Sequence, residues 1–334
     1  MIKIDGSFGE GGGQILRTAI ALSCITGKAV EIYNIRANRP NPGLAMQHLK
    51  GIEAAKVLSN AEVEGMKKGS TKVIFKPKSV KGKMFKIDVG TAGSISLVLQ
   101  VISPIAITAD DVVDVTVIGG TDVKWSPPID YLKNVTFYGL SRMGGKANLM
   151  IVRRGYYPKG GGKVKAIFEP SKLVGLEFKA KKIEKVYGVS HCQNLPPHVA
   201  ERQAKSAKTF LKNFKTEIKV EVSSGISTGS GITIWSKMIG SSSLGEKGKR
   251  AELVGEEAAK KFIEEVNSGA ALDEWVGDQI MIFAAIAKGT TRYTVSKITK
   301  HQISNAYVIN EFLGDCVKIN EKSREIYIKG SGIV

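Results

Sequence analysis

Residues 13–35 read GQILRTAIALSCITGKAVEIYNI, and this stretch sets the pattern from which the fold can be inferred. An apolar segment of about three helical turns follows a glycine and leads into an alternating strand. The same order returns in AGSISLVLQVISPIAITADDVVDVTVI at residues 92–118 and in GDQIMIFAAIAKGTTRYTVSKI at residues 277–298. A glycine-to-helix-to-strand unit that recurs in this way predicts an α/β protein built from related modules. Residues 44–58 predict a second, amphipathic helix in the first module.

The order of predicted helices and strands is different between residues 183 and 272. A strand is followed by a helix predicted at residues 198–214, two alternating strands, a Gly/Ser/Lys loop (GSSSLGEKGKR) and a helix at residues 251–266. This order predicts a compact βαββα domain inserted between the second-last and last modules. We therefore expect a large body made of residues 1–182 and 273–334, and a smaller α/β insert domain made of residues 183–272.

The composition excludes several classes of protein. Of the 334 residues, 43% are hydrophobic and 24% are charged, which is ordinary for a globular chain and too apolar for a disordered one. The 49 basic and 31 acidic residues give a net charge of +18, which favours phosphates, nucleic acid or an anionic membrane surface as partners. Three scattered cysteines predict neither a disulfide framework nor a metal site, so we expect a reducing cytoplasm. No segment predicts a signal peptide or a membrane span.

Two familiar motifs of nucleotide-binding proteins are present only in part, because each lacks a required residue. Residues 155–160 begin like a phosphate loop, but Gly161 stands where a lysine must follow, and no GxGxxG motif follows a strand. Lys3 begins a KxDG match to lysine-adenylating ligases, yet Phe8 stands where those enzymes carry arginine. We therefore interpret Lys3 as an exposed residue of the first strand.

The glycine-rich run GEGGGQILR at residues 9–17 is the first candidate site. A carboxylate inside a glycine-rich turn at a helix N-terminus can hold Mg²⁺, while the free N–H groups and the helix dipole attract phosphate. Glu10 is therefore a candidate ligand of a metal ion that lies beside phosphate. The run also fits a tight turn that carries a solvated glutamate, and the residues alone leave both interpretations open.

A second candidate is the loop IRANRPNPGL at residues 35–44. Arg36 and Arg39 lie three residues apart in an extended segment stiffened by prolines, and two guanidinium groups so placed can grip a polyphosphate or an RNA end. Gln47 follows one helical turn later. A charged surface loop explains the same pattern equally well.

The four histidines of the chain differ in their context. Three have ordinary structural explanations: His48, His191 and His198. His301 instead follows a strand predicted up to Ile298 and precedes a helix predicted from Ala306. A histidine at such a junction is held by backbone on one side and exposed on the other, which suits a nucleophile or a proton carrier.

The motifs of the chain, taken in order, resemble those of one known family. They are DGxxGEGGGQILR (5–17), IRAxRxxPGL (35–44), GxAGSxxLVLQ (90–100), GGTDxxxxPP (119–128), RxGYYPxGGG (153–162), HVAER (198–202), DQ (278–279) and HxxSN (301–305). This sequence is similar to RNA 3′-terminal phosphate cyclases over essentially its whole length. The resemblance implies a catalytic body of repeated βαβαββ units that carries a small α/β insert.

The resemblance also implies a reaction and its participants. Such an enzyme joins ATP to its own histidine with release of pyrophosphate, passes AMP to the 3′-phosphate of RNA, and closes a 2′,3′-cyclic phosphate as AMP leaves. His301 matches the nucleophile and Glu10 the ligand of Mg²⁺ or Mn²⁺. The residues that match the contacts to substrate phosphate are Arg17, Arg36, Arg39 and Gln47. The residues that match the ATP site are Gln100, Pro128, Trp275, Val276, Gly277, Asp278 and Gln279.

A paralogous family supplies the alternative function. Its members are non-catalytic, RNA-binding ribosome-assembly factors that share the fold and lack the catalytic histidine. The presence of His301, Glu10 and both loop arginines favours the active enzyme. The expected partner is RNA with a 3′-terminal phosphate, the expected place is the cytoplasm without a membrane, and the resemblance leaves a homodimer open.

Overall fold

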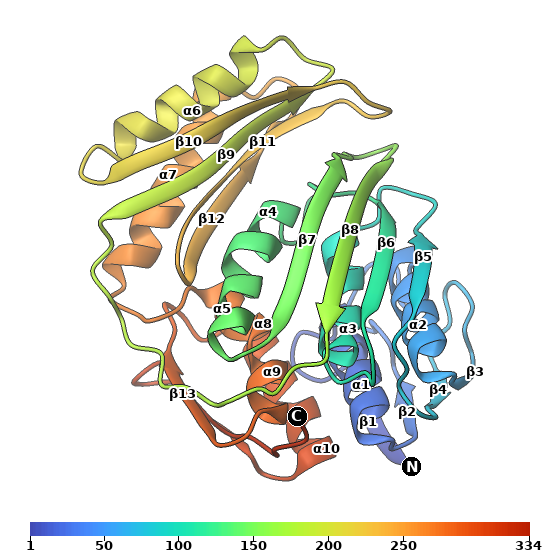
Figure 1. Ribbon diagram of the computed structural model, residues 1–334. Coiled ribbons are helices and arrows are strands. Elements are labelled where there is room, and N and C mark those ends of the chain that lie inside the picture. The colour runs from blue at the N-terminus through green and yellow to red at the C-terminus, as the bar shows by residue number, and fades with distance from the viewer.

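The computed structural model describes residues 1–334, and most of it is a body of three modules with one strand order (Figure 1). The first module contains β1 (Ile2–Asp5), α1 (Gly13–Thr26), β2 (Val30–Tyr33), α2 (Met46–Ser59), β3 (Glu62–Glu64) and β4 (Val73–Lys76). The second contains β5 (Met84–Asp88), α3 (Ile95–Ala106), β6 (Val113–Gly119), α4 (Ile129–Tyr131), the π-helix η1 (Leu132–Thr136), α5 (Phe137–Arg142), β7 (Lys146–Arg153) and β8 (Gly162–Glu169). The two sheets run β1-β2-β4-β3 and β5-β6-β8-β7, so equivalent strands take equivalent places.

The third module has the same order but is interrupted. It contains α8 (Glu274–Gln279), α9 (Met281–Ile286), β13 (Thr290–Thr294), α10 (Lys300–Leu313), β14 (Val317–Asn320) and β15 (Glu325–Lys329), with the sheet order β13-β15-β14. Residues 173–178 lie parallel to β13, through bridges of Val174 with Lys288 and of Glu177 with Arg292. They stand where the other modules have their first strand. The predicted βαβαββ repeat is therefore confirmed, and the additional domain enters inside the third module rather than before it.

Each module begins with a pair of parallel strands joined by a helix, and these first helices are buried at the centre of the body. Parallel neighbours need a crossover of this kind, because a tight hairpin cannot bring two strands into the same direction. From Ile15 to Cys24 every residue of α1 is buried, so this helix has no solvent face. It packs against both α3 and α10, which brings helices of all three modules together.

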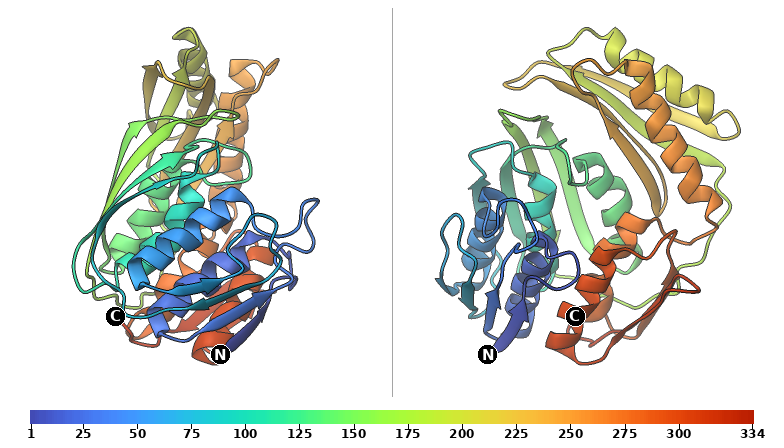
Figure 2. Two further views of the ribbon diagram at one scale, coloured as in Figure 1. Left: turned by 90° about the vertical axis from the view of Figure 1, so that its right-hand side faces the viewer. Right: turned by 180° about the vertical axis from the view of Figure 1, so that it is seen from behind.

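Between residues 178 and 273 the chain forms a smaller unit, which we call the insert. It contains β9 (Lys185–Gln193), α6 (His198–Phe210), β10 (Lys215–Ser223), β11 (Gly229–Ser236), β12 (Ile239–Leu244) and α7 (Ala251–Asn267). Its sheet has the order β10-β9-β11-β12 and a hydrophobic core of its own, separate from that of the body. The sheet lies between its two helices and the body, as Figures 1 and 2 show.

Several predicted elements differ from the structure for identifiable reasons. β12 was predicted as loop because its sequence IGSSSL does not alternate, but Ser241 and Ser243 donate hydrogen bonds to Ala258 O and Glu257 Oε2 of α7, at 2.6 and 2.8 Å. The strand therefore packs small polar residues under a helix instead of a hydrophobic face. α6 ends at Phe210 rather than 214, and Phe214 packs against the core of the insert.

The third module also shows two differences near its helices. α10 begins at Lys300, earlier than predicted, because Thr299 and Gln302 form a reciprocal capping box. Gly277 lies inside α8 rather than in a turn, because Asp273 caps that helix by accepting the N–H groups of Trp275 and Val276, both at 2.8 Å. No helix of the protein combines the length and the apolarity that crossing a bilayer requires.

Candidate active site

His301 lies in the first turn of α10, where two acidic side chains face its ring. Its Nε2 is 2.6 Å from Glu10 Oε2, and its Nδ1 is 4.0 Å from Asp278 Oδ2. Burial alone would lower the pKa of this imidazole, but the hydrogen bond with Glu10 and the charges of both carboxylates outweigh burial and raise the pKa. Nδ1 has no hydrogen-bond partner. Nε2 is therefore held by Glu10, while Nδ1 is buried and faces Asp278 without a hydrogen bond.

Glu10 occupies the glycine turn between β1 and α1, and both of its oxygens have partners. Oε2 faces His301, and Oε1 forms an ion pair with Arg39 from the loop after β2. The hydrogen bond with His301 overcomes burial, and the charges of His301 and Arg39 add to it, so the pKa of Glu10 falls to about 2. Glu10 is thus an ionised carboxylate that joins the first and third modules.

The glycines of this turn are required by the close approach of neighbouring side chains. Gly11 has φ +60°, and a Cβ there would lie 2.4 Å from Asn38 Nδ2. A Cβ on Gly13 would lie 2.3 Å from His48 Nε2. The turn can therefore admit the loop after β2 and the start of α2 only because these positions carry no side chain.

A polar pocket lies where the three modules meet. It is lined by α1, α3 and α8 with α9, which are the first helices of the three modules, and by η1 and α10. The polar residues that line it include Gln14, Arg17, Gln100, Asp278, Gln279 and Asn305. Because Asp278 also faces His301, the pocket and the histidine belong to one site.

Hydrogen bonds inside this pocket connect α1 with α8 and α10. Asn305 Oδ1 accepts hydrogen bonds from Gln14 Nε2 at 3.0 Å and from Thr18 Oγ1 at 2.5 Å, and its Nδ2 donates to the carboxylate of Asp278. Asn305 lies one helical turn after His301, on the same face of α10. It therefore fixes the carboxylate that faces the histidine.

Two buried polar atoms of the pocket have no partner. Arg17 is only 9% exposed and its Nε has no acceptor, while Gln100 Oε1 has no donor. Burial lowers the pKa of Arg17 to about 10, against the opposing charges of Asp278 and Glu10, so the guanidinium remains protonated. Buried polar groups are nearly always paired in folded proteins. Arg17 Nη2 donates to Gln14, but no carboxylate pairs with the guanidinium, so a buried cation with a free N–H and a free acceptor in one pocket indicate a site for a polar, anionic ligand.

The loop arginines and Gln47 have distinct positions. Arg36 Nη1 donates to Asn41 O and Gly43 O, both at 2.8 Å, and so ties together its own loop. Arg39 reaches Glu10, whereas Gln47 Oε1 accepts the N–H of Ser94 at 3.1 Å. Of the predicted phosphate contacts, Arg17 and Arg39 face the site, and the other two hold the loops that surround it.

His48 joins the site although its sequence context indicated only a structural role. Burial, with the charges of Arg17 and Arg36, lowers its pKa to about 3, so the ring is neutral. Its Nδ1 accepts the N–H of Ala45 at 3.1 Å, which leaves the proton on Nε2 beside Gly13.

The residues predicted to bind ATP fall into two groups. Gln100, Asp278 and Gln279 line the pocket, and Gln279 Oε1 accepts a hydrogen bond from Thr136 Oγ1 at 2.6 Å. Four others lie outside the lining: Pro128, Trp275, Val276 and Gly277. Val276 is buried in the core of the body, and Gly277 allows close packing, since a Cβ there would lie 2.4 Å from Val295 Cγ1. Trp275 is half-exposed, and Pro128 is buried at the start of α4.

Sequence reasoning missed Gln14, Thr18 and Asn305. Their spacing carried a usable signal, because Gln14 and Thr18 lie four residues apart on one helix face and Asn305 lies four residues after His301. Lys3, by contrast, is exposed on β1, away from any polar cluster.

A second cluster contains the residue types of a metal site, but the guanidinium group of Arg154 lies among its carboxylates. Asp122, Asp130 and His191 offer ligand atoms within 4.8 Å of one another. Arg154 Nη1, however, donates to Asp130 at 2.7 Å and to Asp122 at 3.3 Å, and Nη2 donates to Glu221 at 2.7 Å. Because His191 and Glu221 belong to the insert, this cluster fastens the insert to the body.

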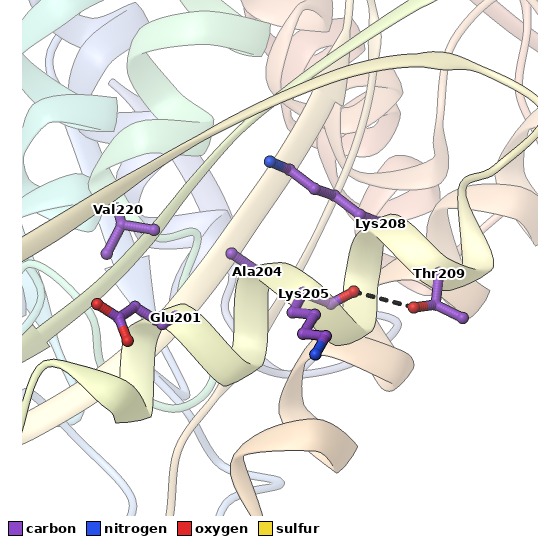
Figure 3. Close-up of a pocket in the computed structure, with 6 residues that line it drawn as sticks. All are labelled: Glu201, Ala204, Lys205, Lys208, Thr209 and Val220. Atoms are coloured by element: carbon purple, nitrogen blue, oxygen red, sulfur yellow. Dashed lines mark hydrogen bonds between the residues drawn. The ribbon is translucent and has the colours of Figure 1, made fainter.

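The insert carries a hollow of its own between α6 and β10 (Figure 3). It is lined by Glu201, Ala204, Lys205, Lys208, Thr209 and Val220, so none of its residues belongs to the body. Lys205 and Lys208 are exposed on α6. This hollow contains no histidine and no buried unpaired group, which separates it from the site at His301.

Three related modules with a polar pocket at their junction, and a histidine between two carboxylates beside it, define a modular α/β enzyme. The sequence model of RNA 3′-terminal phosphate cyclases matches residues 8–319. The chain belongs to this family.

Relatives of the chain are similar over their full length. An RNA 3′-terminal phosphate cyclase of Archaeoglobus fulgidus is 58% identical, over 98% of this chain and 100% of its own. Those of Pyrococcus furiosus and Methanopyrus kandleri are 50% and 48% identical, over 95% and 97% of their own lengths. An enolpyruvyl transferase of Streptomyces tendae superposes with a TM-score of 0.43 at 10% identity, over 99% of this chain and 48% of that one, which is too loose for any argument.

Proposed function

We propose that this protein converts the 3′-terminal phosphate of RNA into a 2′,3′-cyclic phosphate at the expense of ATP, through an adenylated His301. The observation that carries the proposal is His301 itself, placed between Glu10 and Asp278 beside a pocket whose buried Arg17 forms no ion pair and leaves its Nε without an acceptor. The names of the relatives agree with this reaction.

In the first step, a ring nitrogen of His301 attacks the α-phosphorus of ATP. A nitrogen–phosphorus bond forms as the bond to pyrophosphate breaks. We assign the attack to Nε2, because Asp278 faces Nδ1 and can hold the proton there. In the structure Nε2 donates to the ionised Glu10, so the Nε2 proton has to pass to water and the carboxylate has to move away before the lone pair becomes available.

The residues around Glu10 fit a divalent cation such as Mg²⁺ or Mn²⁺. Glu10 supplies a hard carboxylate oxygen of the kind that such ions take together with substrate phosphates, whereas Asp278 faces the other nitrogen of the imidazole. Bound there, the ion would neutralise charge on the phosphates of ATP. Glu10 would then release Arg39 or His301 and bind the ion instead. Release of His301 would free the nucleophilic nitrogen.

In the second step, an oxygen of the RNA 3′-phosphate attacks the phosphorus held by His301. The nitrogen–phosphorus bond breaks and AMP passes to the RNA end, giving RNA(3′)pp(5′)A. In the third step the adjacent 2′-hydroxyl attacks the 3′-phosphorus, and AMP leaves. Arg17 and Arg39 are placed to receive the phosphoryl oxygens, while Arg36 and Gln47 keep the surrounding loops in position.

The decisive experiment is incubation of the purified protein with α-labelled ATP and Mg²⁺, followed by a denaturing gel. The wild type should carry a covalent label, and His301→Ala should lose it. Two controls should retain it: Lys3→Ala, which removes the lysine of the ligase-like motif, and His198→Ala, which removes an exposed histidine of the insert. A label that survives without His301 would overturn the proposal, and no label in the wild type would favour the non-catalytic RNA-binding alternative.

A further inference from the structure

Trp125 is the most conspicuous exposed apolar side chain of the body. It is 95% exposed, and its backbone has φ +60°, a conformation that is strained for a bulky residue. Tyr157, in the loop between β7 and β8, is 77% exposed. Neither ring contributes to the hydrophobic core, so their exposure has no explanation in the stability of the fold.

The loops that carry these rings lie side by side and have firm bases. Thr121 N donates to Gly155 O at 2.8 Å, and Asp122 forms a bridge with Tyr156. Ile129 N donates to Thr121 O at 3.0 Å and closes the loop that has Trp125 near its tip. The backbone therefore presents both rings from one side of the body without a long flexible segment.

The same loops lead toward the site at His301. Gly160, in the loop of Tyr157, packs so closely on residues 91–92 that a Cβ would lie 2.7 Å from Thr91 O. Gly120, at the base of the Trp125 loop, forms a bridge with Ser94. Ser94 in turn donates its N–H to Gln47, which follows the arginine loop. Buried backbone contacts at Ser94 thus connect the base of the Trp125 loop with Gln47, which follows the arginine loop.

Exposed cations lie in the same part of the chain as Tyr157. Lys159 and Lys163 are exposed and have no acidic partner, whereas Lys124, beside Trp125, pairs with Glu246 of the insert at 3.0 Å. Arg153 is also exposed, and its Nε donates to Gly161 O at 2.7 Å. Exposed aromatic faces beside unpaired cations are the combination that binds single-stranded nucleic acid, since bases stack and phosphates are attracted.

We propose that Trp125 and Tyr157 form a stacking platform for the nucleotides that precede the 3′-terminal phosphate of single-stranded RNA. The proposal rests on the proposed function for the identity of the nucleic acid. The platform binds bases by their faces, so it favours no particular sequence. Neither ring lines the polar pocket.

The test compares two substrates that end in the same 3′-phosphate, a dinucleotide and an oligonucleotide of ten residues. Trp125→Ala should raise the KM for the longer RNA by about 5- to 150-fold, which is the range expected from the loss of one stacked base. Its kcat, its KM for the dinucleotide and its labelling by ATP should not change. Tyr157→Leu should have the same pattern, and Trp125→Phe should restore most of the affinity because it keeps an aromatic face.

The matched control is Lys205→Ala with Lys208→Ala, which removes two exposed charges from the outer helix of the insert (Figure 3). In this variant the KM values for the dinucleotide and for the longer RNA should change equally and only slightly. Binding can also be followed without catalysis, because a 3′-hydroxyl oligonucleotide should quench tryptophan fluorescence in the wild type and much less in Trp125→Phe.

Two results would overturn the platform. One is an equal change in KM for the dinucleotide and the longer RNA, and the other is a loss of labelling by ATP in Trp125→Ala, which would place Trp125 in the nucleotide site. These results differ from a failure of the proposed function, in which the wild type itself would neither take label nor cyclise RNA.

Discussion

The clusters around His301 and around His191 contain the same kinds of side chains, a histidine with carboxylates and an arginine, in different surroundings. The side chains of His301 and Glu10 are 31% and 25% exposed, whereas those of His191 and Arg154 are 1% and 5% exposed. At His301 a ring nitrogen has no hydrogen-bond partner, and a pocket lies beside the acids. At His191 the guanidinium of Arg154 fills the centre and bonds three carboxylates.

The difference shows what turns such a set of residues into a site. Burial alone would raise the pKa of Asp122, but the charges of His191 and Arg154 hold it below its usual value, so the buried acid stays ionised and paired. Such a cluster holds two parts of a protein together. The cluster at His301 keeps its partners at the edge of a cavity, where a ligand can replace one of them.

Arg154→Met should have the largest effect, because it leaves Asp122, Asp130 and Glu221 without their cation. Removing one partner of a buried ion pair costs about 3–5 kcal/mol of unfolding free energy. Arg202→Met is the control, since it breaks an exposed pair with Glu252, and such pairs contribute about 0–1 kcal/mol. Urea unfolding of both variants gives the comparison. If Arg154→Met and Arg202→Met lost equal amounts of unfolding free energy, the cluster at His191 would not fasten the insert to the body.

Glu10→Gln should have the next largest effect, and on activity rather than stability. The amide keeps the shape of the side chain but loses the charge that would attract a divalent cation, so labelling by ATP should fall roughly tenfold or more at limiting Mg²⁺. Excess Mg²⁺ should restore part of it. The urea midpoint should fall less than in Arg154→Met, because the side chain of Glu10 is 25% exposed and that of Arg154 only 5%. An unaltered dependence on Mg²⁺ would make Glu10 a turn residue that only pairs with Arg39.

The smallest effect concerns Glu265, a half-buried carboxylate of α7 that forms no ion pair. Burial raises its pKa to about 7, and burial likewise raises that of Asp273 to about 6. The unfolded chain loses these protons at lower pH than the folded one, so stability should fall as the pH rises from about 4.5 to 7. Glu265→Gln should reduce this fall and raise the melting temperature at pH 8 by a few degrees, with little change at pH 4.

Glu264→Gln is the control for that measurement, because Glu264 is the exposed neighbour of Glu265 on the same helix. Its melting temperature should follow the wild type at both pH values. A Glu265→Gln variant with the full pH dependence of the wild type would show that the carboxylate of Glu265 reaches water in solution.

The modules were predictable because each repeats a local pattern, in which an apolar helix follows glycine and precedes an alternating strand. The interruption of the third module was not, because residues 173–178 meet β13 only through isolated bridges and lie far from it in the chain. β12 escaped prediction for a related reason, since its serines bond to α7 and show no hydrophobic alternation.

Within the site, the residues supplied by short motifs were predictable, and those that depend on tertiary contacts were not. His301, Glu10 and Arg39 stand in runs of unusual composition, and the structure brings all three together. His48 was given only a structural role, because its place between Arg17 and Arg36 depends on the packing of α2 against α1. The cluster of Asp122, Arg154 and Glu221 combines three separated segments that no local pattern joins.

The junction of the modules also has a consequence for the making of the protein. Gln14 and Asn305, which meet across the site, are separated by 291 residues, and Glu10 and His301 come from the same two distant segments. A chain still on the ribosome therefore has its glycine turn and arginine loop long before it has its histidine. Under the proposed reaction such a nascent chain could not take AMP, and reactivity toward ATP would appear only when the third module docks.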